Sequence, residues 1–357
     1  MRVVMIALAA LAGFLCLAPA VQAQSDALPR RAGAVDEAYP RVQVIYDAVN
    51  DTHGHLLRVI TTRPRAATGK LAAIFVAGWL SCDSVEAPPG TKDSTSLVFQ
   101  RLAQLPGFVL VRLDKPGIGD SQGICGDTDF TTELDGYRAA FKHMLGYDFV
   151  DPARVFVFGT SNGGGFAPLV SDSAPVKGYL LNGAWSKTWF EHMLEIERRR
   201  LALSGKNPEE VNALMRPEAQ FYEAYLVEGK APRAILAANP ALAAIWPEPE
   251  PDHQYGRPTA FYQQLQALNL EAAWSHVAVP VLVLHGQYDW IMSRGDSELI
   301  VSLVNRNRPG AAALVDLPAT DHNFAHFDSQ QAAFDGKPGP FDRRITDRIA
   351  AWFQAHR

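Results

Sequence analysis

The chain has 357 residues, of which 48% are hydrophobic and 20% are charged, and its formal net charge at pH 7 is -5. This composition is typical of a globular protein with enough apolar side chains for one large core or two smaller ones. The mildly acidic balance without basic runs argues against nucleic acid as a partner, and the sequence has neither a GxxxxGK[ST] loop nor a GxGxxG turn that would indicate nucleotide binding.

The N-terminus has the pattern of a signal peptide. Arg2 supplies a positive charge, the following run to about Ala18 is apolar, and Val21 and Ala23 place small residues where a signal peptidase needs them. The apolar run is short for a membrane span, which takes about 20 residues. We expect cleavage after Ala23, with Ala20 as the alternative, and therefore a periplasmic or secreted protein without a stable membrane anchor.

The predicted elements alternate between strands and helices in the first half of the mature chain, after a polar leader over residues 24–40. Runs typical of strands lie at residues 41–51, 55–65, 70–79, 108–113, 154–161 and 177–185. Segments with helical spacing lie at residues 94–107, 130–147 and 162–173. The first two strands are expected to form a hairpin, and the later alternation predicts an α/β protein with a mostly parallel central sheet and helices on both faces.

A helical insertion interrupts this pattern. From residue 186 to 276 there is no strand candidate, only helical segments around a polar stretch of prolines and glutamates. Alternation then resumes with a strand within 279–289, a helix at 296–307, a strand within 311–322 and a helix at 341–357. We therefore expect one α/β core made of residues 41–185 and 277–357, with an inserted helical cap at 186–276.

The residues GTSNG at positions 159–163 fit the pattern G-x-S-x-G. At a glycine usage of about 7% a random match is expected on the order of 0.1 times in such a chain, so the motif alone is moderate evidence. Its context adds more, because a strand candidate precedes it and a helix candidate follows it. A nucleophile elbow has this placement, with the serine on a strained corner and glycines giving clearance. Ser161 is therefore the candidate nucleophile, and a flexible turn is the alternative.

A serine hydroxyl needs a base to take its proton. Folds with this elbow supply an Asp or Glu and then a His, in loops after later strands. Asp289 follows the first strand after the insertion, and His322 follows the last strand, whereas the loop before the insertion offers only Asn182. Both positions lie at the carboxyl edge of the sheet, where Ser161 is also expected. The order of the three residues predicts a Ser161–His322–Asp289 triad.

Other residues compete for the roles of acid and base. His285 is expected to support a turn, while His326 lies too close to His322 to be excluded as the base. Asp296 has the position of a cap for the following helix. Asp321 directly precedes His322 and is expected to point away from it.

The tetrahedral intermediate of such a reaction needs backbone N–H donors for its oxyanion. The amide after the nucleophile, that of Asn162, is one candidate. The second is expected in the loop after the third strand, where Trp79 follows Gly78. An aromatic lid over the core is the alternative role for Trp79.

The chain resembles the α/β-hydrolase superfamily over almost all of its mature sequence. The segments GTSNG, LDKPGIGDSQG, HGQYD and TDHNF stand where that family has its corresponding segments, and the insertion has the position of its helical cap. VAGW replaces the more usual HG-type oxyanion loop, and Asn162 replaces the commoner His, Met or Gln. The resemblance implies an α/β-hydrolase fold, and Ser161 argues against the dehalogenases and epoxide hydrolases of the family, which use Asp at the elbow. The substrate does not follow from the fold.

Two cysteines, Cys82 and Cys125, remain once the signal peptide with Cys16 is removed. In an oxidising compartment an even pair is compatible with a disulfide, and two unrelated buried thiols are the alternative. Because Cys82 follows the third strand and Cys125 the fourth, both loops lie at the catalytic edge. We therefore expect a disulfide that braces the oxyanion loop.

The insertion is rich in aromatic and acidic side chains. Its aromatic residues are Trp189, Phe190, Phe221, Tyr222, Tyr225, Trp246, Tyr255, Phe261, Tyr262 and Trp274. They either line an apolar pocket or, as is more common, pack the cap against the core. Five clustered glutamates either bind a substrate amine or solvate the helices: Glu191, Glu195, Glu197, Glu209 and Glu210. No HExxH motif is present, so neither a metal nor a cofactor is expected.

These features together predict an exported serine hydrolase that cleaves a small-molecule carboxylic ester through an acyl-enzyme intermediate. The sequence gives neither the acyl and alcohol parts of that ester nor the oligomeric state. A peptidase or amidase with the same triad is the alternative among enzymes. A catalytically silent relative that uses the cap as a binding module is the alternative outside them.

Overall fold

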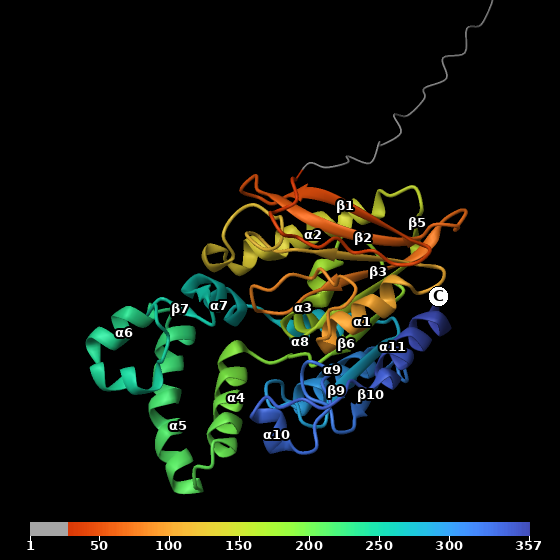
Figure 1. Cartoon of the computed structure of the whole chain (residues 1–357). Helices are drawn as coiled ribbons and strands as arrows, with labels where there is room; N and C mark the ends of the chain where they lie inside the picture. Colours follow the sequence, from red (N-terminus) through yellow and green to blue (C-terminus); the bar gives the residue numbers. More distant parts are fainter. Residues whose placement is uncertain (1–27) are drawn as a thin grey trace, which may run out of the picture.

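The computed structural model describes residues 28–357, so the predicted signal peptide lies outside the described residues. These residues form an eight-stranded sheet in the order β1-β2-β4-β3-β5-β6-β9-β10 (Figure 1). The strands are β1 (Val42–Asn50), β2 (Leu56–Pro64), β3 (Leu71–Ala77), β4 (Phe108–Leu113), β5 (Val150–Thr160), β6 (Gly178–Asn182), β9 (Val281–Gly286) and β10 (Ala312–Leu317). β2 is antiparallel to both of its neighbours, and all other neighbouring strands are parallel. The expected first hairpin and mostly parallel sheet are confirmed.

Helices cover both faces of this sheet. Ala73 and Phe75 of β3 belong to one apolar cluster, and Ala72 and Ile74 belong to another, because successive side chains of a strand point to opposite faces. The first cluster includes residues of α2 (Phe130–Leu145), α3 (Asn162–Val170), α8 (Leu270–Ser275) and α9 (Arg294–Asn307). The second includes residues of α1 (Ser94–Ala103) and α11 (Arg343–His356). Burial on both faces explains why β3 is an unbroken apolar run.

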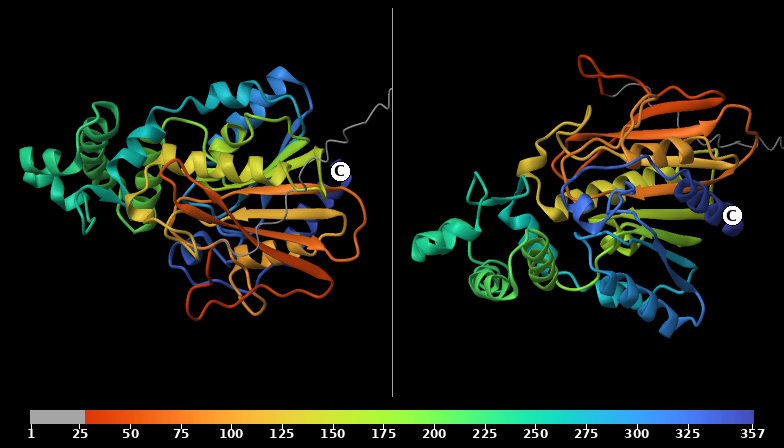
Figure 2. Two further views of the ribbon diagram at one scale, coloured as in Figure 1. Left: turned by 90° about the horizontal axis from the view of Figure 1, so that it is seen from above. Right: turned by 60° about the horizontal axis from the view of Figure 1, so that its bottom comes forward.

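The segment between β6 and β9 is mainly helical, as expected. Besides α8 it contains α4 (Trp189–Leu203), α5 (Pro208–Tyr222), α6 (Pro232–Ala238) and α7 (Thr259–Gln266), and Figure 2 shows that much of it projects to one side of the sheet. The expectation of no strand here is wrong, because β7 (His253–Gln254) and β8 (Arg257–Pro258) form an antiparallel ribbon. Strands of two residues are too short to show a hydrophobic period.

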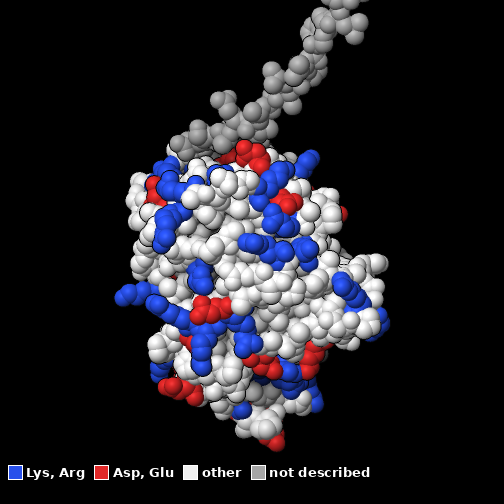
Figure 3. Space-filling view, turned by 90° about the vertical axis from the view of Figure 1, so that its right-hand side faces the viewer, with Lys and Arg blue, Asp and Glu red and all other residues white. Residues whose placement is uncertain are grey.

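The surface carries charges of both signs. Figure 3 shows one face on which basic and acidic side chains are interspersed rather than gathered into one area of each sign. Among residues 28–357, no helix combines the length and the apolar character needed to cross a membrane. A short helix, α10 (Gln330–Phe334), lies between β10 and α11.

Candidate active site

Ser161 lies at the sharp turn between β5 and α3. Its backbone has φ 55° and ψ -125°. A positive φ at a residue other than glycine costs on the order of 1–3 kcal/mol and is tolerated where the surroundings impose it. The packing at this turn is close, because a Cβ at Gly163 would overlap the carbonyl oxygens of Ala77 and Gly78. The structure therefore has the strained strand-to-helix corner that GTSNG predicts.

Asp289 and His322 are joined by a hydrogen bond in the loops after β9 and β10. The distance between Nδ1 of His322 and Oδ2 of Asp289 is 2.8 Å. The other carboxylate oxygen, Oδ1, accepts from the amides of Ile291 and Met292 at 3.0 and 2.8 Å, which fixes the orientation of Asp289. Both side chains of the pair are buried. With Nδ1 engaged by the carboxylate, Nε2 is the nitrogen left to accept a proton.

Each member of this pair shifts the pKa of the other. Burial alone would lower the pKa of His322, but the charge of Asp289 and the hydrogen bond between them raise it above its ordinary value. Burial alone would raise the pKa of Asp289, yet the charge and hydrogen bond of His322 lower it. Asp289 is therefore ionised at neutral pH and stabilises the imidazolium that forms when His322 takes up a proton.

Ser161 and His322 line the same cavity, which has a volume of about 950 Å³. It lies at the carboxyl edge of the sheet, and α4 of the insertion forms part of its wall. The large apolar and aromatic side chains of the wall are Trp79, Leu80, Phe99, Trp189, Ile196, Tyr255, Trp290, Ile291, Met292, Phe324, Phe327 and Phe341. Among the aromatic residues of the insertion, Trp189 and Tyr255 line the cavity, and the others pack elsewhere. The packing role is therefore the commoner one, as expected.

Asn182 and Gly183, at the end of β6, connect the elbow to the His322–Asp289 pair. The main-chain carbonyl of Asn182 accepts a hydrogen bond of 2.9 Å from the amide of Ser161, and its side-chain amide donates one of 2.9 Å to the carbonyl of His322. Gly183 has φ 55°, and a Cβ there would lie 2.6 Å from Nδ1 of His322 and 2.9 Å from Oδ2 of Asp289. Neither residue has a role among the sequence-based expectations. The one feature of the sequence that pointed to them was their position at the carboxyl end of the strand that follows the elbow.

The competing acids have other partners. Asp296 is not the cap of α9, as its position suggested, because Ser293 is the N-cap residue. Asp296 lies buried in the first turn and accepts hydrogen bonds of 3.0 Å from both the amide and the hydroxyl of Ser186. Asp321 accepts from the amide of Ala325 at 2.7 Å.

Within residues 28–357, no group of three or more His, Cys, Asp or Glu side chains is arranged to hold a metal ion.

Trp79 and Asn162 line the cavity together with Ser161. Asn162 is the first residue of α3, where the N–H groups have no partners within the helix. The indole of Trp79 stacks on Phe99 of α1, with the ring centroids 6.0 Å apart and the rings inclined by 18°. The side chain of Trp79 thus forms part of the wall of the cavity that Ser161 and Asn162 also line.

The structure contains the disulfide between Cys82 and Cys125 that the sequence predicts, with the two Cα atoms 6.0 Å apart. Cys82 lies in the loop after β3, which also carries Trp79. Cys125 opens a 3₁₀ turn, Cys125–Asp127, after β4. The bond therefore ties two loops together at the carboxyl edge of the sheet.

The sheet order, the strained serine corner and the inserted helices define an α/β hydrolase. The model of the family described as serine aminopeptidase, S33, matches residues 93–322. The chain belongs to this family. A comparison with curated protein sequences gives no match.

Solved structures of low sequence identity share the fold. Est1E from Butyrivibrio proteoclasticus, determined with bound ferulic acid, aligns with a TM-score of 0.56 and 17% identity over 87% of this chain and 98% of its own. The esterase domain of a Rhodothermus marinus protein aligns with a TM-score of 0.52 and 16% identity over 88% and 98%. An esterase from Pyrococcus furiosus aligns with a TM-score of 0.52 and 11% identity over 92% and 97%. At these identities the likeness extends to the fold alone.

Proposed function

We propose that this protein is an exported serine hydrolase that cleaves a carboxylic ester with Ser161, His322 and Asp289. The observation that carries the proposal is the His322–Asp289 hydrogen bond beside a cavity that Ser161, on its strained corner, also lines. A nucleophile, a base and a group that orients the base are the parts that acyl transfer needs.

In the proposed reaction, Nε2 of His322 takes the proton of the Ser161 hydroxyl as its oxygen attacks the ester carbonyl. The buried Asp289 carboxylate stabilises the imidazolium that results. The amides of Asn162 and Trp79 donate to the oxyanion of the tetrahedral intermediate. His322 then protonates the leaving alcohol, which leaves an acyl-enzyme on Ser161. Water, deprotonated by the same imidazole, releases the acid and restores the serine.

The walls of the cavity support an ester with an apolar or aromatic part as the substrate. Trp189, Trp290 and Phe341 are among the large apolar side chains that line it. Pockets of this kind gain most of their affinity from apolar contact, and a few polar groups fix orientation. Several proteins that share the fold are esterases, and one of them was determined with a bound aromatic acid.

An aminopeptidase is the second candidate, because the family carries that description. It would need a free carboxylate near Ser161 to bind the substrate amine. The five glutamates of the insertion noted in the sequence are not among the residues that line the cavity. Glu191 belongs to the capping box of α4, and Glu195 pairs with Lys187. Four other acids do line the cavity, and each of them accepts a hydrogen bond from another residue of the chain: Asp83, Glu86, Asp93 and Asp321. These partners favour an ester.

The test compares p-nitrophenyl esters of graded acyl length with aminoacyl p-nitroanilides. We expect hydrolysis of the esters and a kcat/KM for the anilides at least about a hundredfold lower. Faster hydrolysis of the anilides would support the aminopeptidase instead. Hydrolysis of neither series would contradict both candidates.

Export is tested separately by expression of the full chain in a bacterial host and sequencing of the N-terminus of the purified product. Cleavage after Ala23 would leave Gln24 as the first residue. An intact N-terminus on protein retained in the cytoplasm would contradict export and leave the catalytic proposal untouched.

A further inference from the structure

Lys115 is a buried cation in the loop after β4, with 3% of its surface exposed. An ammonium group is costly to bury unless partners satisfy it. Its Nζ donates to the main-chain carbonyl of Trp79 and, at 2.9 Å, to that of Ser81. It also lies 3.7 Å from Oε1 of Glu133. The ammonium group thus has two carbonyl hydrogen-bond acceptors and one carboxylate at ion-pair distance.

Two of these partners belong to the loop that carries the proposed oxyanion donor. A peptide group is planar and trans, so its carbonyl and its N–H point in opposite directions. Lys115 holds the carbonyls of Trp79 and Ser81, and so fixes the peptide groups that follow these two residues. The first of them adjoins the N–H of Trp79 through a single Cα, so the lysine restrains the backbone next to the proposed donor without contacting the donor's own peptide group. The disulfide holds the same loop at Cys82. The loop is therefore fixed from two sides.

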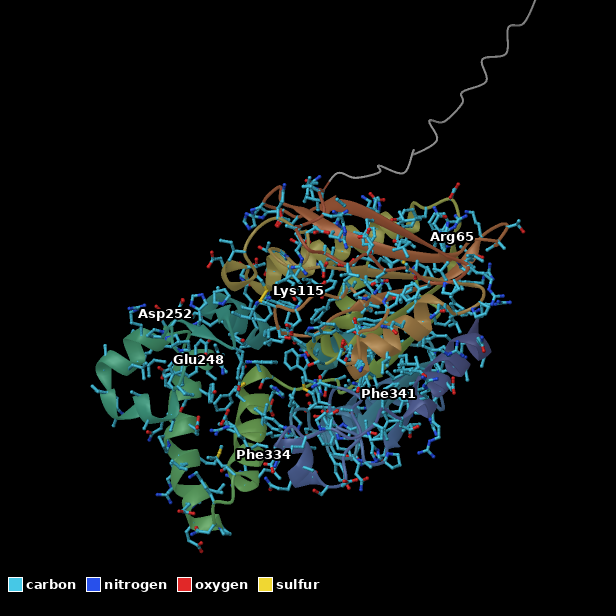
Figure 4. All side chains as sticks on the ribbon, viewed as in Figure 1. Arg65, Lys115, Glu248, Asp252, Phe334 and Phe341 are labelled. Carbon is cyan, nitrogen blue, oxygen red and sulfur yellow. A yellow bond between two sulfur atoms is a disulfide. The ribbon has the colours of Figure 1, made fainter. Side chains whose placement is uncertain are left out.

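Glu133 connects Lys115 to the insertion. Its Oε2 accepts from the guanidinium of Arg257 in β8. Arg257 is fully buried, and its Nη1 lies 2.8 Å from Sγ of Cys125. Figure 4 shows Lys115 on the side of the core that faces the insertion. The lysine is thus part of a buried network that joins the insertion, the disulfide and the loop after β3.

We propose that Lys115 is a positioning residue for ester hydrolysis, which holds the loop at residues 78–82 in the conformation that donates to the oxyanion. This inference rests on the proposed function. Lys115 is not among the residues that line the cavity, so it acts through the loop and not on the substrate. Because the oxyanion develops in the transition state, loss of Lys115 lowers kcat more than it changes KM. Burial also lowers the pKa of Lys115 to about 8, which agrees with a confined position.

The test uses Lys115→Met, which removes the donors, and Lys115→Arg, which retains charged donors. Lys230→Met is the control, because Lys230 is an exposed lysine whose described ion pair is with Glu228. For each variant kcat and KM are measured with p-nitrophenyl acetate and with its thionoester, whose sulfur accepts hydrogen bonds less well than oxygen. Circular dichroism and thermal unfolding establish that each variant is folded.

We expect Lys115→Met to lose at least about tenfold in kcat for the ester, with KM changed by less than about threefold. In the same variant, the ratio of kcat for the ester to kcat for the thionoester also falls. Lys115→Arg recovers part of the kcat and part of this ratio, and Lys230→Met matches the wild type in both. A folded Lys115→Met protein with unchanged kcat and preference would overturn the inference. An equal loss on both substrates would also overturn it, because that indicates a merely structural role.

If Lys115→Met does not fold, Lys115→Gln, which keeps one donor group, is judged by the same kcat and preference criteria. A wild type that hydrolyses no ester would contradict the proposed function itself. That failure is visible before any variant is compared, so the two claims fail separately.

Discussion

The side-chain amide of Asn182 donates a hydrogen bond of 2.9 Å to the main-chain carbonyl of His322. The main chain of Asn182 also binds the amide of Ser161. One residue at the end of β6 thus holds the positions of the proposed nucleophile and the proposed base. Because these two residues lie far apart in sequence, their relative placement depends on such contacts.

The first prediction concerns this contact. Asn182→Ala removes the bond to His322 and leaves a buried carbonyl unpaired, which costs about 1–3 kcal/mol in the free energy of unfolding. We expect kcat/KM for the ester to fall at least about tenfold, since small displacements of a base are costly. The control is Asn305→Ala, which removes a similar bond of 3.0 Å to the carbonyl of Ala312, and one of 2.9 Å from the amide of Ala312, away from the cavity. Equal activity in both variants would show that Asn182 does not position His322.

The second prediction concerns Gly183. In Gly183→Ala the new methyl group would meet Nδ1 of His322 and Oδ2 of Asp289, so we expect the hydrogen bond between them to break and kcat to fall on the order of a hundredfold. Gly310→Ala is the matched control, because Gly310 also has a positive φ, of 76°, but nothing lies within 4 Å of the place that its new methyl group would take. Both variants carry backbone strain. A similar activity in the two variants would show that the His322–Asp289 hydrogen bond does not depend on the absence of a side chain at Gly183.

The third prediction concerns pH. His322 must be neutral to accept a proton, so activity falls as the pH drops through its pKa, which Asp289 raises above the ordinary value. In Asp289→Asn the acid limb of kcat/KM moves to lower pH, and kcat falls by up to about 10⁴-fold. Asp316→Asn, which removes a half-exposed partner of Arg294, should leave the profile unchanged. An acid limb at the same pH in Asp289→Asn would contradict the pairing.

The fourth prediction concerns the disulfide. Replacement of Cys82 and Cys125 by serine opens a link across 43 positions of sequence. Loss of such a link lowers the free energy of unfolding by about 2–4 kcal/mol, which chemical denaturation measures. Because the bond also holds the loop of Trp79, we expect a lower kcat for the ester. Unchanged kcat in the folded double variant would show that the bond stabilises the fold without bracing the loop.

Local patterns predicted much of the fold. The apolar run of β3, the alternation of strands and helices, and the glycines around Ser161 each depend on neighbours in sequence. Asp289 and His322 are predicted as acid and base because each follows a strand whose carboxyl end faces the same edge. The structure brings these two side chains into contact, as the sequence predicts.

The rest depended on contacts between distant segments. Asp296 has the local appearance of a helix cap, yet its partner is Ser186, 110 positions away. The roles of Gly183 and Lys115 follow from what lies beside them in space. The sequence around Lys115 does not predict that its side chain donates to the carbonyl of Trp79.

The central claim is that Ser161 is the nucleophile, and covalent labelling tests it most directly. The mature protein is treated with a fluorophosphonate, digested and examined by mass spectrometry, with Ser161→Ala as the comparison. We predict one adduct, on the Ser161 hydroxyl of the wild type, and none on the variant. Equal labelling of the two proteins, or a folded wild type that takes up no label, would contradict the account.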